Sequence, residues 1–217
     1  MSAPIPATSA PSQGDANRGT PSPGQGDVLA FLLSRRSHPA RTLGLPVPDR
    51  PALLPLLTAA ARSPDHGKLV PWRFVVLERR SLLRLAVLAR ERGAAFGLAP
   101  ERIEKGVRQY ADGHLAVAVV ASPKPSASIP EIEQHLSAGA VCLALLNAAL
   151  AAGWGANWLT GWAAHDATFC AEGLGLAPGE FVAGLIHIGT PTTTPSDRPR
   201  PDLDQLVTWA EDSCERF

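Results

Sequence analysis

The stretch LAVAVVAS, residues 115–122, is the segment of this 217-residue sequence that says most about the fold. It is a nearly continuous run of small and β-branched apolar residues, which is typical of a strand buried on both faces. Two more strands are predicted from their composition, RFVVLE at 73–78 and FVAGLIHIG at 181–189. Because helical patterns lie between these strands, the order of elements predicts an α+β sandwich with helices packed against one modest sheet.

The helices are predicted from apolar residues at helical spacing and from capping signals. Asp27 is expected to cap a helix that ends near Ser34, and Asp49 is expected to begin a second one. Pro51 and Pro55 are compatible with the second helix only if both lie in its first turn, where a missing N–H costs little. Further helices are expected over residues 81–95, 100–112, 130–152, 166–174 and 203–212.

The predicted helix at 130–152 is apolar almost all round from Leu136 to Ala152. A membrane-spanning helix is one interpretation of such a run. The run is just short of spanning length, however, and polar or small residues such as Ser137 and Asn147 interrupt it. A helix that is apolar on every side is more often buried in a core or a subunit interface, and we favour that interpretation.

Composition and charge exclude several classes of function. Twenty basic and twenty acidic side chains balance, so no overall field attracts nucleic acid or anionic lipid. Cys142, Cys170 and Cys214 lie far apart in the sequence and have neither a disulfide framework nor zinc-site spacing. Such cysteines are typical of a reducing compartment, so the predicted location is the cytoplasm, with no metal, nucleic-acid or membrane site.

The first 27 residues consist largely of Pro, Gly, Ser, Thr and Ala. This tract cannot bury enough apolar surface to offset its ordering entropy, so residues 1–27 are predicted to be a disordered extension. It has neither the apolar stretch of a secretory signal nor the arginine content of a transit peptide. Residues 28–217 are long enough for one core and are predicted to form a single domain.

Three stretches could bind a ligand, and each also has a purely structural interpretation. Arg35-Arg36-Ser37 suits a phosphate, because guanidinium donors match its oxygens, although a basic helix end explains the tripeptide alone better. The polar loop at 62–66 is equally compatible with ligand contacts and with turn hydrogen bonds. Residues 153–162 carry three tryptophans that could form the wall for a flat ligand, although core packing is favoured for any one of them.

The sequence contains no G-x-G-x-x-G after a strand, no P-loop and no G-x-S-x-G motif, so an enzyme with this sequence would depend on a cofactor. Taken in order, its motifs resemble those of the FMN-dependent nitroreductase family, and of its short-chain subgroup in particular. The motifs are R-R-S, A-R-x-P-D-H-x-x-x-x-P-W, S-A-G at the start of the long helix, G-x-x-W-x-x-G and G-T-P. They lie at residues 35–37, 61–72, 134–139, 155–161 and 189–191.

The resemblance implies a fold, an assembly and a cofactor. The fold would be a three-layer α/β/α sandwich with a central mixed, mostly antiparallel sheet. Two chains would entwine as a homodimer, with FMN at the subunit interface and the apolar 136–152 helix buried between them. Arg35 and Ser37 would hold the FMN phosphate and Arg36 would add backbone or ribityl contacts. Arg62 and His66 would reach the cofactor from the partner subunit.

The resemblance also implies that Trp158, Leu159 and Thr160 line the cofactor, largely through backbone groups. Some relatives carry arginine at the position of Leu159, and either Arg198 or Arg200 is predicted to replace the missing contact. Relatives often have a basic residue two positions after the R-R-S serine, near the pyrimidine edge of the flavin. This chain has proline there, and the nearest basic residue is Arg41.

The activity implied is transfer of hydride from NAD(P)H through FMN to a nitroaromatic, a quinone or a similar acceptor, with ping-pong kinetics. The cofactor would carry the chemistry, so no catalytic side chain is predicted. Two alternatives keep the same flavin site: a protein that sequesters or senses flavin without turnover, and a reductase that acts on an enone or another acceptor. A helical protein without a cofactor is a third alternative, which the ordered set of motifs disfavours.

Overall fold

The computed structural model describes residues 25–65 and 67–210 and divides the chain into two compact units, residues 1–35 and 36–217. In the first unit, helix α1 spans Gln25–Ser34. The predicted helix up to Ser34 is therefore confirmed, but it begins before Asp27, which lies in its first turn and does not cap it. The predicted disordered extension falls largely on residues outside the described ones. It stays a prediction, as does the single domain over 28–217.

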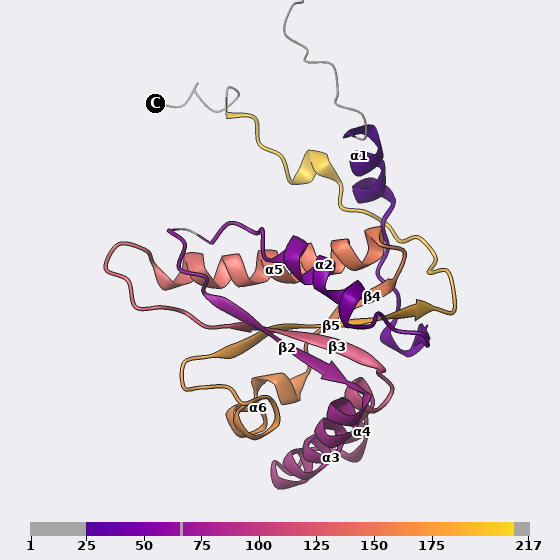
Figure 1. The fold of residues 1–217 in the computed structure, drawn as a ribbon, viewed down its shortest axis with the longest axis vertical. Coiled ribbons are helices and arrows are strands. Elements are labelled where there is room, and N and C mark those ends of the chain that lie inside the picture. The colour runs from indigo at the N-terminus through magenta and orange to yellow at the C-terminus, as the bar shows by residue number, and fades with distance from the viewer. Residues whose placement is uncertain (1–24, 66, 211–217) are drawn as a thin grey trace, which may run out of the picture. The chain divides into compact units, whose positions relative to one another are not determined.

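A five-stranded sheet lies at the centre of the second unit (Figure 1). Its strands are β1 Leu43–Gly44, β2 Trp72–Glu78, β3 Leu115–Ala121, β4 Gly155–Leu159 and β5 Phe181–Pro191. The order across the sheet is β1-β5-β3-β2, and β4 also pairs with β5. All of these pairings are antiparallel. Every residue of β3 is buried, as its composition predicts, because strands flank it and helices cover both of its faces.

Helices form the two outer layers, as Figure 1 shows. They are α2 Arg50–Ala60 and α5 Glu131–Ala151 on one face, and α3 Arg79–Ala95, α4 Pro100–Ala111 and α6 Ala167–Leu174 on the other. Side chains of β3 alternate between two cores: Val117 and Val119 join the α2–α5 core, and Ala116 and Ala118 join the α3–α4–α6 core. The fold is the predicted α+β sandwich of three layers.

Helix α5 is long and apolar enough to cross a membrane by length and composition, and it is the one such helix in the described residues. One face is packed into the core, where Val141, Cys142 and Leu145 are completely buried. The other face leaves Leu136 and Leu143 exposed. Its packing against the sheet is that of a core helix with an additional apolar outer stripe.

Three predicted elements differ from the structure. Pro55 lies inside α2 and not in its first turn, since the helix begins at Arg50 behind the Asp49 N-cap. Strand β4 forms in a glycine-rich stretch for which no strand was predicted, because β5 offers it a complete antiparallel partner. Within the described part of the predicted 203–212 helix there is only a 3₁₀ turn at Leu203–Gln205, whose exposed residues have no core to pack against.

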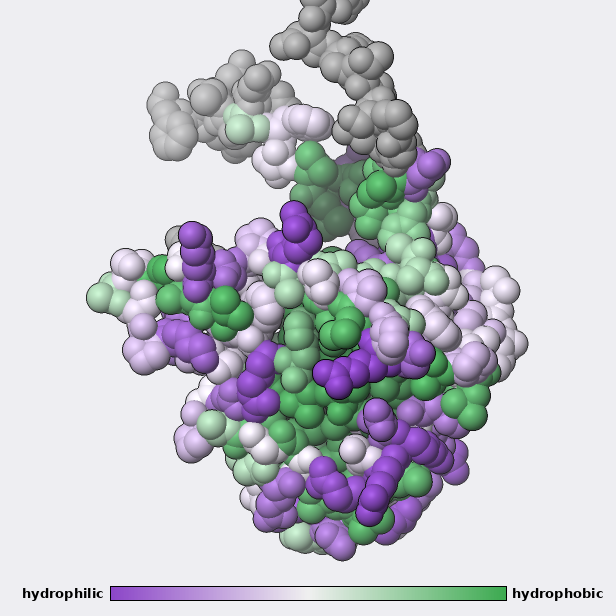
Figure 2. Space-filling view, in the orientation of Figure 1, coloured by the Kyte–Doolittle hydropathy of each residue, from purple (hydrophilic) through white to green (hydrophobic). Residues whose placement is uncertain are grey.

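Strand β2 forms one edge of the sheet and carries exposed apolar surface. Figure 2 shows an apolar area near the centre of the face on which β2 lies in Figure 1. Val76 of β2 is 40% exposed, and Leu83 and Val87 of α3 are exposed as well. Edge strands with such surface are sites where another chain can pack.

Candidate functional site

The residues that follow α1 are fixed beside strand β4. The backbone N–H of His38 donates to the carbonyl of Ala156 at 2.9 Å, and Asn157 Nδ2 donates to the carbonyl of His38 at 2.6 Å. Arg36 and Ser37, which precede this contact, are half-buried. The structure therefore brings the R-R-S segment from Arg36 onward next to the strand that carries the G-x-x-W-x-x-G motif, 119 residues later in the chain.

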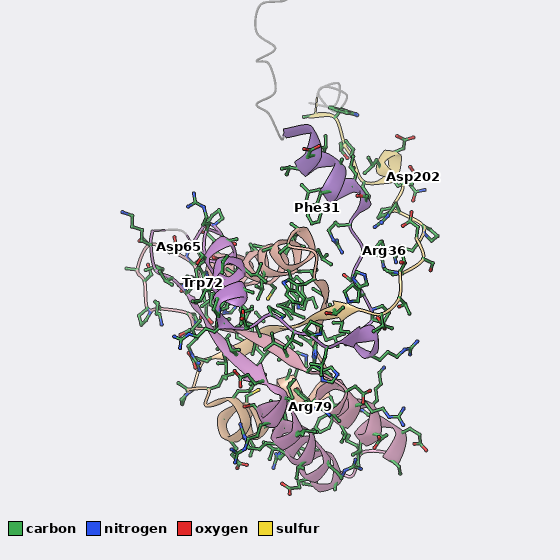
Figure 3. The ribbon with its side chains drawn as sticks, turned by 45° about the vertical axis from the view of Figure 1, so that its right-hand side comes forward. Phe31, Arg36, Asp65, Trp72, Arg79 and Asp202 are labelled. Atoms are coloured by element: carbon green, nitrogen blue, oxygen red, sulfur yellow. The ribbon has the colours of Figure 1, made fainter. Side chains whose placement is uncertain are left out.

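Two arginines predicted to contact the FMN meet on one carboxylate. Arg36 Nη1 lies 2.8 Å from Asp197 Oδ1, and Arg200 Nη2 lies 3.0 Å from the same oxygen. A backbone hydrogen bond from Arg198 and the side-chain bond from Arg36 lower the pKa of the Asp197 carboxyl. Asp197 is thus ionised at neutral pH, and in Figure 3 Arg36 points toward the C-terminal tail that carries it. Two guanidinium groups converge on one oxyanion here.

Asp197 was not among the predicted site residues. Its place between prolines and arginines in the tail gives only a weak signal, because acidic residues near arginines are common on surfaces. Arg198, the other candidate in the tail, has an exposed side chain. Arg35 ends the first unit, where its N–H donates to the carbonyl of Phe31 at 2.7 Å.

The loop between α2 and β2 is anchored to helix α5. The indole Nε1 of Trp72 donates to Ser137 Oγ at 3.1 Å, and Ser137 Oγ donates to the carbonyl of Pro64 at 2.6 Å. Trp72 and Ser137 are both buried. Within the loop, Asp65 Oδ2 accepts from the N–H of Val70 at 3.2 Å. These hydrogen bonds connect the P-W end of one motif with the S-A-G of another in space.

Arg62, predicted to contact the cofactor, is exposed beyond the end of α2. His66, predicted with it, lies outside the described residues. Figure 3 shows Asp65 of this loop on the side of the unit away from Arg36. The structure therefore does not bring Arg62 together with Arg36 within one chain.

Leu159 and Thr160 line an open cleft of about 1280 Å³. Its other walls come from residues 39–41 and from helix α4, and Arg41 is among them. Trp158 points away from this lining and packs over Gly184 of β5, where an added Cβ would lie 2.2 Å from the indole Nε1. Two of the three residues predicted to line the cofactor, Leu159 at the end of β4 and Thr160 after it, thus border the cleft, and Trp158 packs against β5 instead.

Trp162 fixes α4 against the end of β4, a role that the sequence did not predict. Its indole Nε1 donates to the carbonyl of Arg102 at 3.3 Å. An added Cβ on Gly106 would lie 2.3 Å from that nitrogen, and one on Gly161 would lie 2.1 Å from Gln109 Oε1. The two glycines permit this close approach, so the helix and the loop form one rigid wall of the cleft.

His187 of β5 is almost completely buried, and neither ring nitrogen has a hydrogen-bond partner among the described residues. Burial lowers its pKa to about 4, so the ring is neutral at physiological pH. It pairs in register with Asn157, which lines the cleft. His187 is a neutral, packed side chain behind the cleft and not an exposed acid or base.

The profile described as "Nitroreductase family" matches residues 32–190, which is most of the chain. The chain belongs to the nitroreductase family. A protein of Escherichia coli (strain K12) named "Putative NAD(P)H nitroreductase YdjA" is 31% identical over 184 residues, covering 84% of this chain and 99% of that protein. A Haemophilus influenzae protein named "Putative NAD(P)H nitroreductase" is 35% identical over 166 residues, covering 76% of this chain and 88% of that protein.

Solved structures agree with this assignment. A nitroreductase-like family protein of Bacillus cereus superimposes with a TM-score of 0.70 at 21% identity, covering 89% of this chain and 98% of that one. A Desulfovibrio desulfuricans protein, described as a "putative nitroreductase in complex with fmn", superimposes with a TM-score of 0.65 at 25% identity, covering 87% and 96%. The nitroreductase fold predicted from the motifs is confirmed.

Proposed function

We propose that this nitroreductase-family protein is an FMN-dependent oxidoreductase that takes electrons from NAD(P)H and passes them to a nitroaromatic, a quinone or a similar acceptor. The observation that carries the proposal is the convergence of Arg36 and Arg200 on one oxyanion, beside the strand that leads into the cleft. Membership of the family and the names of the relatives support the same reaction class.

The residues present fit FMN. Arginine pairs are suited to phosphate oxygens, and Arg36 and Arg200 already share an anionic oxygen. Arg35, Ser37 and Arg198 would complete the phosphate site. The cleft beside residues 159–161 is open and partly apolar, as a flat ring system requires.

When bound, FMN supplies two-electron redox chemistry between the nucleotide and the acceptor. The chain's own residues bind, orient and balance charge. Leu159 and Thr160 would present backbone groups to the ring system, and Trp158 holds their strand in place over Gly184. Arg41, on the cleft wall, would supply positive charge to the reduced cofactor. One cleft that serves donor and acceptor in turn predicts ping-pong kinetics.

The proposed active form is a homodimer. Arg62 and the loop around it do not meet Arg36 within one chain, so a contact of Arg62 and His66 with the cofactor would come from a second copy. The exposed apolar stripe of α5, with Leu136 and Leu143, is the surface that a second copy would cover. Burial of this stripe would also account for the apolar composition of the helix all round.

The absorption spectrum of the purified protein, followed by titration with FMN and then NAD(P)H, tests the cofactor and the turnover together. Arg35→Ala and Arg36→Ala should each weaken FMN binding by about 2–5 kcal/mol, because each removes a charge partner of the phosphate. Arg80→Ala, a distant exposed arginine on α3, is the matched control and should bind FMN like the wild type. Flavin that binds but is never reduced would support a sequestering or sensing protein.

Complementation tests the shared site. Arg36→Ala and Arg62→Ala should each be inactive alone. Mixed dimers should regain one intact site, made of the wild-type Arg36 of one chain and the wild-type Arg62 of the other. Absence of recovered activity in verified mixed dimers would contradict the arrangement across subunits.

A further inference from the structure

Helix α4 brings a group of cations to the cleft that the binding of FMN does not use. Arg102 and Lys105 are exposed, line the cleft and form no ion pair within the described residues. They lie three positions apart on the helix, so their side chains are neighbours on its surface. Two adjacent positive charges therefore face the same open space as Thr160.

The acidic residues of the cleft cancel only part of this charge. Glu104 is already paired with Arg108 at 3.1 Å and with Arg90 at 3.2 Å. These bonds lower the pKa of the Glu104 carboxyl, so it stays ionised and engaged. Glu101 and Asp112 also line the cleft, against Arg41, Arg102 and Lys105. The excess positive charge lies at those three residues.

Helix α4, which carries these cations, packs against the loop at residues 160–161 that follows β4. Trp162, directly after that loop, donates to the backbone carbonyl of Arg102 itself. Gly106 leaves room for the Trp162 indole and Gly161 leaves room for the Gln109 side chain, since an added Cβ would clash at either position. The backbone that carries Arg102 and Lys105 is therefore held against this loop, and a ligand bound by the two cations would share the cleft with Leu159 and Thr160.

We propose that Arg102 and Lys105 bind the diphosphate of NAD(P)H and so determine the affinity for the electron donor. The inference rests on the proposed function, which supplies a donor with two adjacent negative charges. The cleft, at about 1280 Å³, exceeds the roughly 300–1,000 Å³ of pockets for drug-sized ligands, as an extended dinucleotide requires. In this proposal Arg41 contacts the flavin, and Arg102 and Lys105 bind the dinucleotide.

The test is anaerobic stopped-flow reduction of the FMN-loaded protein by NADH and by NADPH. Each exposed charge contact is worth about 0.2–1 kcal/mol, so Arg102→Gln with Lys105→Gln should raise the half-saturating donor concentration about 2- to 25-fold. The limiting rate of reduction, and reoxidation by an uncharged quinone, should not change. Arg80→Gln, which removes one positive charge on α3 and is compared with each single variant on α4, should behave as the wild type. About 0.5 M NaCl should weaken donor binding to the wild type but not to the double variant.

If NAD(P)H reduces the FMN of the wild-type protein while the double variant keeps the same half-saturating donor concentration, that result would overturn this inference and leave the proposed function intact. An equal rise in Arg80→Gln would also overturn it, because the effect would then come from net charge. Wild-type flavin that neither nucleotide reduces would overturn the proposed function itself.

Discussion

Ser137→Ala tests the hydrogen bonds that connect the loop after α2 to helix α5. The change removes the acceptor of the Trp72 indole N–H, at 3.1 Å, and the donor to the Pro64 carbonyl, at 2.6 Å. Each of the two buried groups left without a partner costs about 1–3 kcal/mol, so the free energy of unfolding should fall by about 2–6 kcal/mol. In a chain of this length that corresponds to a decrease in Tm of roughly 4–24 °C.

Urea and thermal unfolding of the flavin-free protein, followed by circular dichroism, measure this loss. Thr58→Ala is the matched control, because its exposed hydroxyl donates to a helix carbonyl and its removal should change stability by less than about 0.5 kcal/mol. Trp72→Phe removes the indole N–H, so Ser137→Ala should cost less in that background. A loss no larger than that of Thr58→Ala, or strictly additive losses in the double variant, would refute the reasoning.

Three further predictions concern stability and pH. The hydrogen bonds of Arg73 hold the pKa of Glu180 at about 2, below the unfolded value of about 4.3. The ionised Glu180 therefore stabilises the folded state fully at a pH above about 4.3, and this stabilisation is lost as the pH falls from there toward about 2. Urea titrations should show Glu180→Gln to be less stable than the wild type at pH 7 and the gap to close near pH 2. His187 has a folded pKa of about 4 against about 6.5 unfolded, so the free energy of unfolding should fall as pH drops between these values. His187→Leu should flatten that slope, and an unchanged slope would count against the burial argument. Gly106→Ala should cost about 1–3 kcal/mol through its contact with Trp162, although alanine favours helices, and a gain in stability would disprove the close packing.

The sequence predicted the parts of the fold in which local composition and tertiary packing favour the same structure. LAVAVVAS forms a strand because its side chains fill two cores at once, and the long helix is apolar because much of it is buried. Strand β4 was missed, since Gly155, Ala156 and Asn157 have little intrinsic strand preference and pair only because β5 is there. The predicted tail helix failed for the opposite reason, because apolar residues such as Leu206 find no surface to pack on.

The candidate site was predictable as a set of segments but not as contacts. The motifs indicated Arg36, Ser37 and the end of β4, which the structure brings together. Arg36 and the tail lie far apart in the sequence, so the shared carboxylate of Asp197 could not be foreseen. The contact of Trp162 with α4 was equally hidden, because it depends on glycines in two separate elements.

Strand β5 hydrogen-bonds to β1, β3 and β4, and it ends at Pro191. During synthesis, the ribosome therefore has to reach the end of β5 before the sheet can close. Until then, nascent β3 has a bare edge of alternating valines, a segment prone to intermolecular pairing. We expect fragments that stop before residue 181 to aggregate or to be held by chaperones, whereas those that extend past 191 become compact.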